Sequence, residues 1–382
     1  MGGTARNFNV PVPLFCGAGF LLSRKSRKEV IKMKKSTKLI AFLMSVLLIA
    51  AFVFAGCDSK TQPAAAESSV PNTRAVSETT DVPAQYKVGI IQFMPHSSLD
   101  NCCKGIKNAL DEAKIDYDVQ VGSTASAVDD CQNYAARMAS SGEYDVIIAI
   151  ATPSAAAAYS AVRNASADIP VVFCAVSDPV AAKLVESIEK PGNNCTGTSD
   201  SFDIVSQIEI IKAVQPELTK LGVFYTTTEP NSLSQLKILK DECEKNGIEL
   251  IDQGINDATE LPAAAAALIP QVEAVTNLTD NNVVDNMATV LEQAKAANIP
   301  VYGSEIEQVR KGCLAAASID YVALGEQTGK MAVEILGGKS AAEMPVSVVS
   351  DSTPVFNTDA AKELGLEIPE VYADAEKVTT AE

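Results

Sequence analysis

The segment 144–180 constrains the fold more than any other part of this 382-residue chain. Its run Val146–Ala151 is apolar without interruption, which is typical of a parallel strand buried on both faces of a sheet. Thr152-Pro153 then suits the first positions of a helix. A second apolar run, Val171–Val176, ends in the same way at Ser177-Asp178. Two such units in tandem predict a parallel sheet whose turns share one carboxyl edge, where open α/β sheets bind ligands.

The same alternation of apolar runs and helical patterns recurs from Tyr86 to Pro369. It predicts an α/β fold made of two Rossmann-like, doubly wound parallel-sheet lobes. Among the expected helices are Ala181–Ile188 and Val283–Ala297. The turns lack the glycines of a dinucleotide fingerprint and the Gly-Lys-Ser/Thr of a P-loop, and no cofactor is expected. Their hydroxyls, backbone amides and carboxylate suit a small polar ligand instead.

Residues 33–57 carry the pattern of a secretory signal, with a basic head, an apolar run Leu39–Phe54 and then Ala-Gly before Cys57. A cysteine in this position resembles the lipobox of bacterial lipoproteins, in which the thiol is diacylated and becomes the new N-terminus. Two alternatives are an ordinary cleaved signal and a membrane helix, because the run is near the short limit for spanning. Residues 1–32 show no signal pattern, so translation is expected to begin at Met33.

The charge of the chain changes once this leader is set aside. Residues 1–56 hold nine of the 31 Lys and Arg residues and one of the 48 acidic residues, which leaves 22 basic and 47 acidic residues and a net charge of −25. That charge excludes a nucleic-acid-binding surface and fits a solvated extracytoplasmic protein. Residues 57–85 are rich in Ser, Thr, Ala, Pro and Glu without apolar periodicity, which predicts a disordered tether between a lipid and the folded part.

Long, ordered motifs carry a resemblance to one family. They are Val-Ile-Ile-Ala-Ile-Ala-Thr-Pro-Ser at 146–154, Ile-Pro-Val-Val-Phe-Cys-Ala-Val-Ser-Asp-Pro at 169–179, Leu-Thr-Asp-Asn-Asn-Val at 278–283 and Ile-Asp-Tyr-Val-Ala-Leu-Gly-Glu-Gln-Thr at 319–328. They resemble the lipoprotein substrate-binding proteins of ABC transporters, a group that includes tryptophan/tyrosine-type importers. The resemblance covers roughly residues 86–369.

The resemblance implies a type I periplasmic-binding-protein fold, with two lobes joined by three hinge strands and a ligand closed between them. Residues 86–198 plus 319–345 would form the first lobe and 199–318 plus 346–369 the second, with 370–382 as a tail. In this topology the helix Tyr321–Leu336 packs on the first lobe, and a strand around Val346–Val355 returns to the second. The implied partners are an amino-acid-like ligand and an ABC permease, and the protein is expected to be a monomer.

Candidate ligand contacts lie where the predicted strands end. Thr152 and Ser154 cap a helix and could also present its amides to a carboxylate. A ligand ammonium would need a buried carboxylate, and the candidates are Asp280, which is favoured first, Asp200 and Glu305. Asp178, before Pro179, is either a ligand contact or a helix cap. Each of these acids has an alternative role as a solvated turn residue or a helix cap.

Each of the other candidates could contact the ligand or have a purely structural role. Gln92 and Tyr225 end the first strand of each lobe and could face the cleft, while Asn231 and Asn281 are turn residues with amides that donate and accept. The remaining candidates, on the loops after the strands, are Phe93, His96, Leu99, Ala175, Ser177 and Gly303. Phe93 and Leu99 form either an apolar pocket or a loop anchor, and His96, the only histidine, is either a contact or an uncharged loop residue. The sequence does not identify the side chain of the ligand.

The nine cysteines include no Cys-x-x-Cys pair, which argues against a zinc site. Most are expected to pack as free thiols, with Cys174 and Cys195 as a candidate disulfide.

The leading hypothesis is a membrane-tethered receptor that captures an amino-acid-like solute for an ABC permease. An enzyme on the same fold is disfavoured, because the sequence offers no nucleophile–base pair and no Gly-x-Ser-x-Gly. A sensor that signals to a membrane partner is the third hypothesis, and the folded part of the chain does not distinguish sensing from import.

Overall fold

The computed structural model describes residues 86–349 and 352–381. The predicted leader, the lipid-attachment residue Cys57 and the tether up to residue 85 lie outside the described residues. Within the described part, no helix combines the length and the apolar character that crossing a membrane requires.

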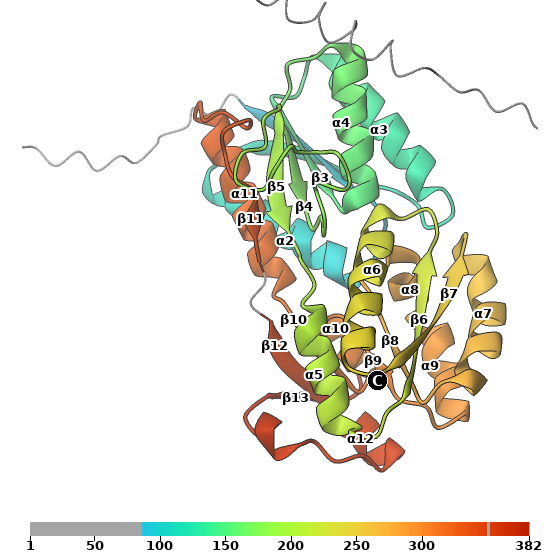
Figure 1. Ribbon diagram of the computed structural model, residues 1–382. Helices are drawn as coiled ribbons and strands as arrows, with labels where there is room; N and C mark the ends of the chain where they lie inside the picture. The colour runs from blue at the N-terminus through green and yellow to red at the C-terminus, as the bar shows by residue number, and fades with distance from the viewer. Residues whose placement is uncertain (1–85, 350–351, 382) are drawn as a thin grey trace, which may run out of the picture. The chain divides into compact units, whose positions relative to one another are not determined.

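The first lobe is built on a six-stranded sheet in the order β11-β5-β4-β3-β1-β2, in which every neighbouring pair is parallel. Its strands are β1 (Lys87–Gln92), β2 (Asp116–Val121), β3 (Val146–Ile150), β4 (Val171–Cys174), β5 (Cys195–Ser199) and β11 (Ser347–Val348). Its helices are α2 (Ser97–Glu112), α3 (Ala127–Ser141), α4 (Thr152–Ala165) and α11 (Tyr321–Leu336). Helices α3 and α4 cover one face of the sheet, and α2 and α11 cover the other (Figure 1).

The second lobe contains a parallel sheet in the order β7-β6-β8-β9 and a three-stranded sheet in the order β10-β12-β13. Their strands are β6 (Lys220–Thr226), β7 (Glu249–Ile255), β8 (Ala274–Thr276), β9 (Val301–Tyr302), β10 (Ala315–Ser318), β12 (Thr353–Asn357) and β13 (Glu376–Val378). The helices are α5 (Ile204–Val214), α6 (Pro230–Lys245), α7 (Leu261–Leu268), α8 (Asn281–Asp285), α9 (Met287–Ala296), α10 (Ile306–Arg310) and α12 (Thr358–Leu364). Backbone bonds from Leu314 to Val301 (2.7 Å) and from Gly303 to Ala315 (2.9 Å) join the two sheets.

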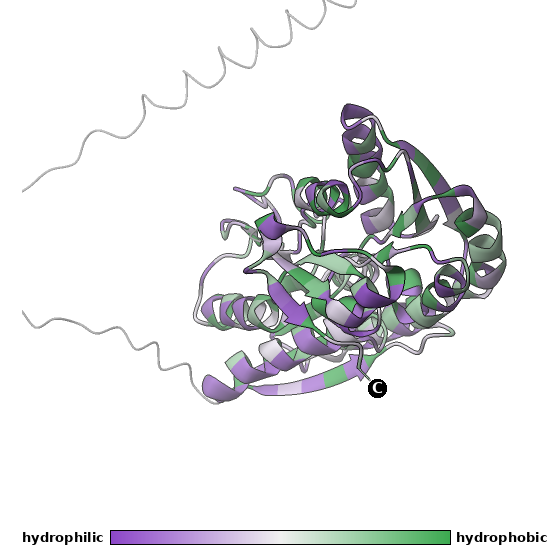
Figure 2. Cartoon of the chain, turned by 90° about the horizontal axis from the view of Figure 1, so that it is seen from below, coloured by the Kyte–Doolittle hydropathy of each residue, from purple (hydrophilic) through white to green (hydrophobic). Residues whose placement is uncertain are grey.

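The strands at the centre of each parallel sheet are buried on both faces, as their uninterrupted apolar runs predict. All five residues of β3 are buried, and β1 is buried from Val88 onward. In Figure 2 several strands are green along their length, whereas the helices mix purple and green because one side of each faces solvent. The α/β fold with parallel sheets is therefore confirmed.

Helix α11 follows β10 of the second lobe and packs against α2 of the first, as the resemblance implied. Two glycines permit the close approach of these helices. A Cβ at Gly325 would lie 2.1 Å from the carbonyl oxygen of Cys102, and one at Gly105 would lie 2.0 Å from that of Val322. The chain crosses between the lobes three times, after β5, after β10 and after β11.

The structure differs from the sequence expectation in two helices. Residues 181–188 form turns, because Lys183 has a left-handed φ of 60° and its amide bonds to the carbonyl of Val180, three residues back. The expected helix Val283–Ala297 is two helices, α8 and α9, which are divided at Asn286. The side-chain amide of Asn286 donates to the carbonyl oxygen of Asn282 (2.9 Å), which also accepts from the backbone N–H of Asn286 (3.2 Å).

Two expectations near the C-terminus also change. The strand expected around 346–355 is two strands, with β11 in the first-lobe sheet and β12 in the second lobe. The segment 370–382 contains β13, which pairs in parallel with β12, so these residues extend a sheet and are not a simple tail. The seven cysteines in the described residues are buried and free, and Cys174 and Cys195 form no disulfide.

Candidate ligand-binding cleft

A cavity lies between the two lobes at the carboxyl ends of their parallel strands. The space inside it that water can reach is about 20 Å³, so the side chains of the two lobes approach each other closely in this arrangement. Both lobes contribute to its lining, which consists of His96, Ser98, Leu99, Ala151, Thr152, Ala175, Ser177, Asp200, Asn231, Thr279, Asn281, Val284, Ser304, Glu305, Gln308 and Tyr321. A cavity at this edge of an α/β sheet, with convergent polar groups, is the usual form of a small-molecule site.

Two alanines in unusual backbone conformations shape the first-lobe wall. Ala151 follows β3 with φ of 79°, and Ala175 follows β4 with φ of 54°, although left-handed φ values are uncommon for residues with a Cβ. Both residues line the cavity. Their strain turns the chain sharply at the strand ends, so that Thr152 and Ser177 reach the cavity.

A carboxylate and two hydroxyls form the hinge end of the cavity. Asp200, just after β5, accepts hydrogen bonds from Ser177 Oγ (3.0 Å) and from Tyr321 Oη (3.2 Å). Its side chain is 3% exposed. Burial raises the pKa of Asp200 to about 6, although the two hydroxyl donors act in the opposite direction.

Gln235 of α6 links the two lobes. Its Oε1 accepts from the backbone N–H of Thr279 (2.9 Å), so its Nε2 is the donor to Ser177 Oγ (3.0 Å) and Thr279 Oγ1 (2.6 Å). Ser177 belongs to the first lobe, and Gln235 and Thr279 belong to the second. We call these three residues the clasp. The bond from Gln235 to Ser177 crosses the gap, so it exists only when the lobes are closed.

A second bond across the gap involves the only histidine. His96 precedes α2, and its Nε2 lies 3.1 Å from Oδ1 of Asn281 at the start of α8. Asn281 in turn donates from Nδ2 to Glu229 Oε2 (2.6 Å). Glu229 is 3% exposed, and burial together with the charge of nearby Asp280 raises its pKa to about 8.

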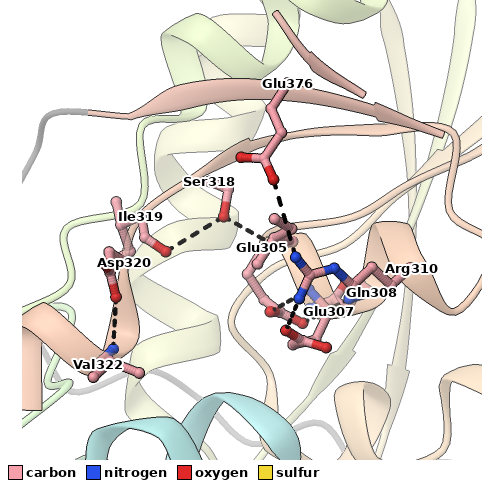
Figure 3. Close-up of polar contacts among 10 residues, drawn as sticks. Glu305, Glu307, Gln308, Arg310, Ser318, Ile319, Asp320, Val322 and Glu376 are labelled. Atoms are coloured by element: carbon pink, nitrogen blue, oxygen red, sulfur yellow. Dashed lines mark hydrogen bonds and ion pairs between the residues drawn. The ribbon is translucent and has the colours of Figure 1, made fainter. Parts of the chain in front are cut away.

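Glu305 forms the second acidic wall of the cavity. Its carboxylate accepts from the backbone N–H groups of Glu307 (2.7 Å) and Gln308 (2.8 Å), which caps the short helix α10 (Figure 3). Burial raises the pKa of Glu305 to about 7, partly offset by these backbone donors. Nearby, Arg310 pairs with Glu307 and is 4.0 Å from Glu376, so its charge is committed outside the cavity.

Three buried polar atoms on cavity residues have no hydrogen-bond partner among the described residues. They are Nδ1 of His96, Oγ1 of Thr152 and Oδ1 of Asn231. His96 and Thr152 come from the first lobe and Asn231 from the second. Because an unpaired buried polar group costs free energy, such atoms on facing walls indicate a site whose polar groups are completed by a ligand.

The cavity is acidic. Asp200 and Glu305 line it, and no Lys or Arg from the described part of the chain does so. A ligand with a positively charged group would therefore gain most from closure. No group of three or more His, Cys, Asp and Glu residues suited to a metal occurs within the described residues.

The structure places nine of the candidates from the sequence on the cavity wall. They are His96, Leu99, Thr152, Ala175, Ser177, Asp200, Asn231, Asn281 and Glu305.

Seven candidates lie elsewhere, and most have partners that explain their positions. Gln92 donates to Asp100 Oδ1 (2.7 Å), Ser154 bonds the carbonyl of Ile150, and Asp178 caps the turn at Ala181 (2.9 Å). Phe93 lines a separate groove beside α3 and α4.

The other three are in the second lobe. The ring of Tyr225 lies over Gly254, and Gly303 offers its carbonyl oxygen to Gln207 Nε2 (3.0 Å). Asp280, the acid favoured from the sequence, accepts from Thr226 N (2.6 Å), Thr226 Oγ1 (2.8 Å), Ser232 Oγ (2.6 Å) and Val283 N (3.0 Å). Its lone pairs are used within the lobe, so its observed role is to fix the turn before α8.

Sequence reasoning missed seven lining residues: Ser98, Ala151, Thr279, Val284, Ser304, Gln308 and Tyr321. Thr279 and Ser304 could have been predicted from the sequence, since each is next to a candidate residue. Tyr321 comes to the cavity only through the crossing from β10 to α11, which local patterning does not show.

A family model described as ABC transporter substrate binding protein matches residues 87–379. The chain belongs to this family. Its members and the relatives below are solute-binding proteins and not enzymes.

One relative is the "Tyrosine-binding protein" of Clostridioides difficile (strain R20291), which is 35% identical over 343 residues, covering 88% of this chain and 94% of the relative. A solved structure from Streptococcus pneumonia, in complex with L-Trp, is 33% identical with a TM-score of 0.71 and covers 77% of this chain and 99% of its own. A third is the ligand-free, open structure of a substrate binding protein with adhesive properties from Clostridium difficile. It is 38% identical with a TM-score of 0.59, and the match covers 78% of this chain and 100% of that structure's chain.

The L-Trp complex and the ligand-free structure can each be compared in shape with this substrate-binding protein. The open structure is more similar in sequence yet less similar in shape than the L-Trp complex. This agrees with the bonds across the gap, which identify the present arrangement as a closed one.

Proposed function

We propose that this substrate-binding protein captures an aromatic amino acid between its lobes and delivers it to an ABC permease. The observation that carries the proposal is the set of three unpartnered buried polar atoms on His96, Thr152 and Asn231, residues that line one cavity from both lobes. The names of the relatives, one described as tyrosine-binding and one solved with L-Trp, support an aromatic ligand.

The ammonium group of the ligand would bind at the acidic residues of the cavity, Asp200 and Glu305. Asp200 has two hydroxyl donors in place, and a carboxylate has room for more, so one or two ammonium N–H groups can complete its coordination. Glu305 contributes a second negative charge to the same cavity. Pairing a buried carboxylate with an ammonium removes the cost of leaving either charge alone in the closed cleft.

The start of α4 gives the ligand's carboxylate its site. This helix runs for 14 residues, and Thr152 at its first position lines the cavity. The first amides of a helix have no partner within the helix and lie at the positive end of its dipole, which favours an anion. Thr152 Oγ1, which is unpartnered among the described residues, would donate to the same carboxylate.

Capture proceeds by closure of the lobes about the three crossings. The ligand contacts both walls only in the closed state, and it shifts the population toward closure by that difference in binding. The clasp and the bond from His96 to Asn281 stabilise the closed form. Diacylation of Cys57 would hold the protein on the outer surface of a membrane, beside its permease, with residues 58–85 as the tether.

Calorimetry and thermal unfolding of the full-length chain test the proposal. L-Tyr and L-Trp are expected to bind and to raise the melting temperature, whereas L-Asp should not, because a second carboxylate would meet an acidic cavity. Failure of every aromatic amino acid to bind would refute the ligand class. Mass spectrometry of the protein from its native membrane tests separately for the diacyl group on Cys57.

A further inference from the structure

The single histidine of the chain is fixed by a chain of hydrogen bonds that begins in the opposite lobe. His96 is 9% exposed, and its Nε2 faces Oδ1 of Asn281 at 3.1 Å. Which atom carries the proton follows from the orientation of the Asn281 amide, since an amide oxygen can only accept and an amide nitrogen can only donate.

Glu229 sets that orientation. Its Oε2 accepts from three donors, which are Nδ2 of Asn281 (2.6 Å), the backbone N–H of Asn281 (3.1 Å) and Nδ2 of Asn231 (3.1 Å). The backbone N–H of Asn281 can only donate, so Oε2 is an acceptor and any proton on Glu229 belongs on Oε1. The nitrogen of the Asn281 amide therefore faces Glu229, its oxygen faces His96, and Nε2 of His96 is the donor.

The other ring nitrogen of His96 is then an acceptor without a donor. Burial lowers the pKa of His96 to about 4, so the ring is neutral at physiological pH and Nδ1 carries a lone pair. Nδ1 is buried and has no partner in the described part of the chain, and His96 lines the cavity.

Two aliphatic residues line the same cavity as His96. Leu99 lies three residues after His96 at the start of α2, and Val284 lies three residues after Asn281 on α8. The cavity thus combines the acceptor Nδ1 with aliphatic side chains, and Asp200 with its hydroxyl partners supplies its charged group. An aromatic ring that carries one hydrogen-bond donor matches that surface.

We infer that Nδ1 of His96 selects, among aromatic amino acids, those whose ring bears an O–H or N–H donor. Glu229 and Asn281 are positioning residues that act through the tautomer of His96. The inference rests on the proposed function and deepens it, because it separates tyrosine and tryptophan, which have a ring donor, from phenylalanine, which has none.

Affinity for the three amino acids tests the selection. Calorimetry on the full-length chain should show L-Tyr and L-Trp binding at least about tenfold more tightly than L-Phe, since L-Phe leaves a buried acceptor unpaired. If L-Phe binds as tightly as L-Tyr, the inference fails while the proposed function stands. If none of the three binds, both fail.

Two substitutions of the histidine separate its ring nitrogens. His96→Asn keeps an acceptor near the position of Nδ1 but does not reach Asn281, and His96→Gln reaches toward Asn281 but leaves the Nδ1 position empty of an acceptor. His96→Asn should keep the preference for L-Tyr over L-Phe at reduced affinity for both. His96→Gln should lose the preference, and the reverse pattern would overturn the assignment.

Nitrogen NMR tests the positioning residues without relying on affinity. With ¹⁵N-labelled histidine the chain gives signals from one ring. In the L-Tyr complex, Nε2 should be protonated and Nδ1 should be an acceptor. Glu229→Leu should mix the tautomers because Asn281 can then rotate its amide, and Glu229→Gln, which keeps an oxygen, should restore the single form. A protonated Nδ1 in the wild-type complex, or an unchanged tautomer in Glu229→Leu, would contradict the inference.

Discussion

At the scale of single residues, the cavity shows how one residue type takes opposite roles. Asp280 and Asp200 both follow strands, and the sequence favoured Asp280 as the ligand's partner. Asp280 instead has four donors from its own lobe, while Asp200 lines the cavity with two. The sequence identifies an acid at the end of a strand, but it does not show which donors fold around that acid, because Thr226 and Ser232 are distant from it in the chain.

Replacing Asp280 therefore tests a structural role. Asp280→Ala removes an acceptor shared by Thr226, Ser232 and Val283 and should lower the free energy of unfolding by about 3 kcal/mol, since several buried donors lose their partner. Chemical denaturation measures this loss. Unchanged stability of the variant would contradict the assignment.

The acids of the cavity predict that low pH favours closure without ligand. Burial in the closed form raises the pKa of Asp200 to about 6 and of Glu305 to about 7. In the open form both groups are solvated and titrate near about 4. A raised pKa in the closed form means that closure takes up protons on these two acids, so their contribution to closure is most favourable below about pH 4 and is lost as pH rises through 6 and 7. His96, whose pKa burial lowers to about 4, contributes in the opposite direction at low pH.

Small-angle scattering of the ligand-free chain measures this effect. The radius of gyration should rise as pH is raised from 5 to 8, and the variant Asp200→Asn with Glu305→Gln should show much less change, because neither side chain can ionise. A radius that is independent of pH in the wild type would show that closure does not bury these carboxyl groups.

At the scale of elements, the alternation of strands and helices was predictable because buried parallel strands leave long apolar runs. The strand expected at Val146–Ala151 is β3 with one residue fewer. The two helices that were wrong failed for local reasons, since Lys183 adopts a left-handed φ and Asn286 divides α8 from α9. Neither residue forbids a helix by its type, so the sequence pattern did not show either break.

The crossing of α2 and α11 depends on glycine. Gly325→Ala would place a Cβ 2.1 Å from the carbonyl oxygen of Cys102, so the helices must separate, and stability should fall by about 2–3 kcal/mol. Gly337→Ala is the matched control, because its φ of −75° suits alanine and its nearest neighbour is 3.3 Å away. Melting temperatures compare the two variants, and equal values would show that the helices can repack.

At the scale of the whole molecule, the clasp couples the lobes at Ser177. Gln235→Leu removes the donor to Ser177 across the gap, together with the bond to Thr279 in its own lobe, and should weaken ligand binding by about tenfold, mainly through faster dissociation. Gln271→Leu is the control, since Gln271 is exposed and its side chain bonds only the carbonyl of Ala267. Stopped-flow measurement of dissociation rates tests this, and equal rates in the two variants would remove the clasp from the closing mechanism.

The three crossings have a consequence for how the protein is made. A chain is synthesised from its N-terminus, and the first lobe receives α11 and β11 only after the whole four-stranded sheet of the second lobe has emerged. Without α11, the part of the first sheet that it covers and the glycine-lined side of α2 remain exposed. The first lobe cannot complete its packing until α11 and β11 are made, and the second lobe until β12 and β13 are made, so a nascent chain carries uncovered apolar surface through most of its synthesis.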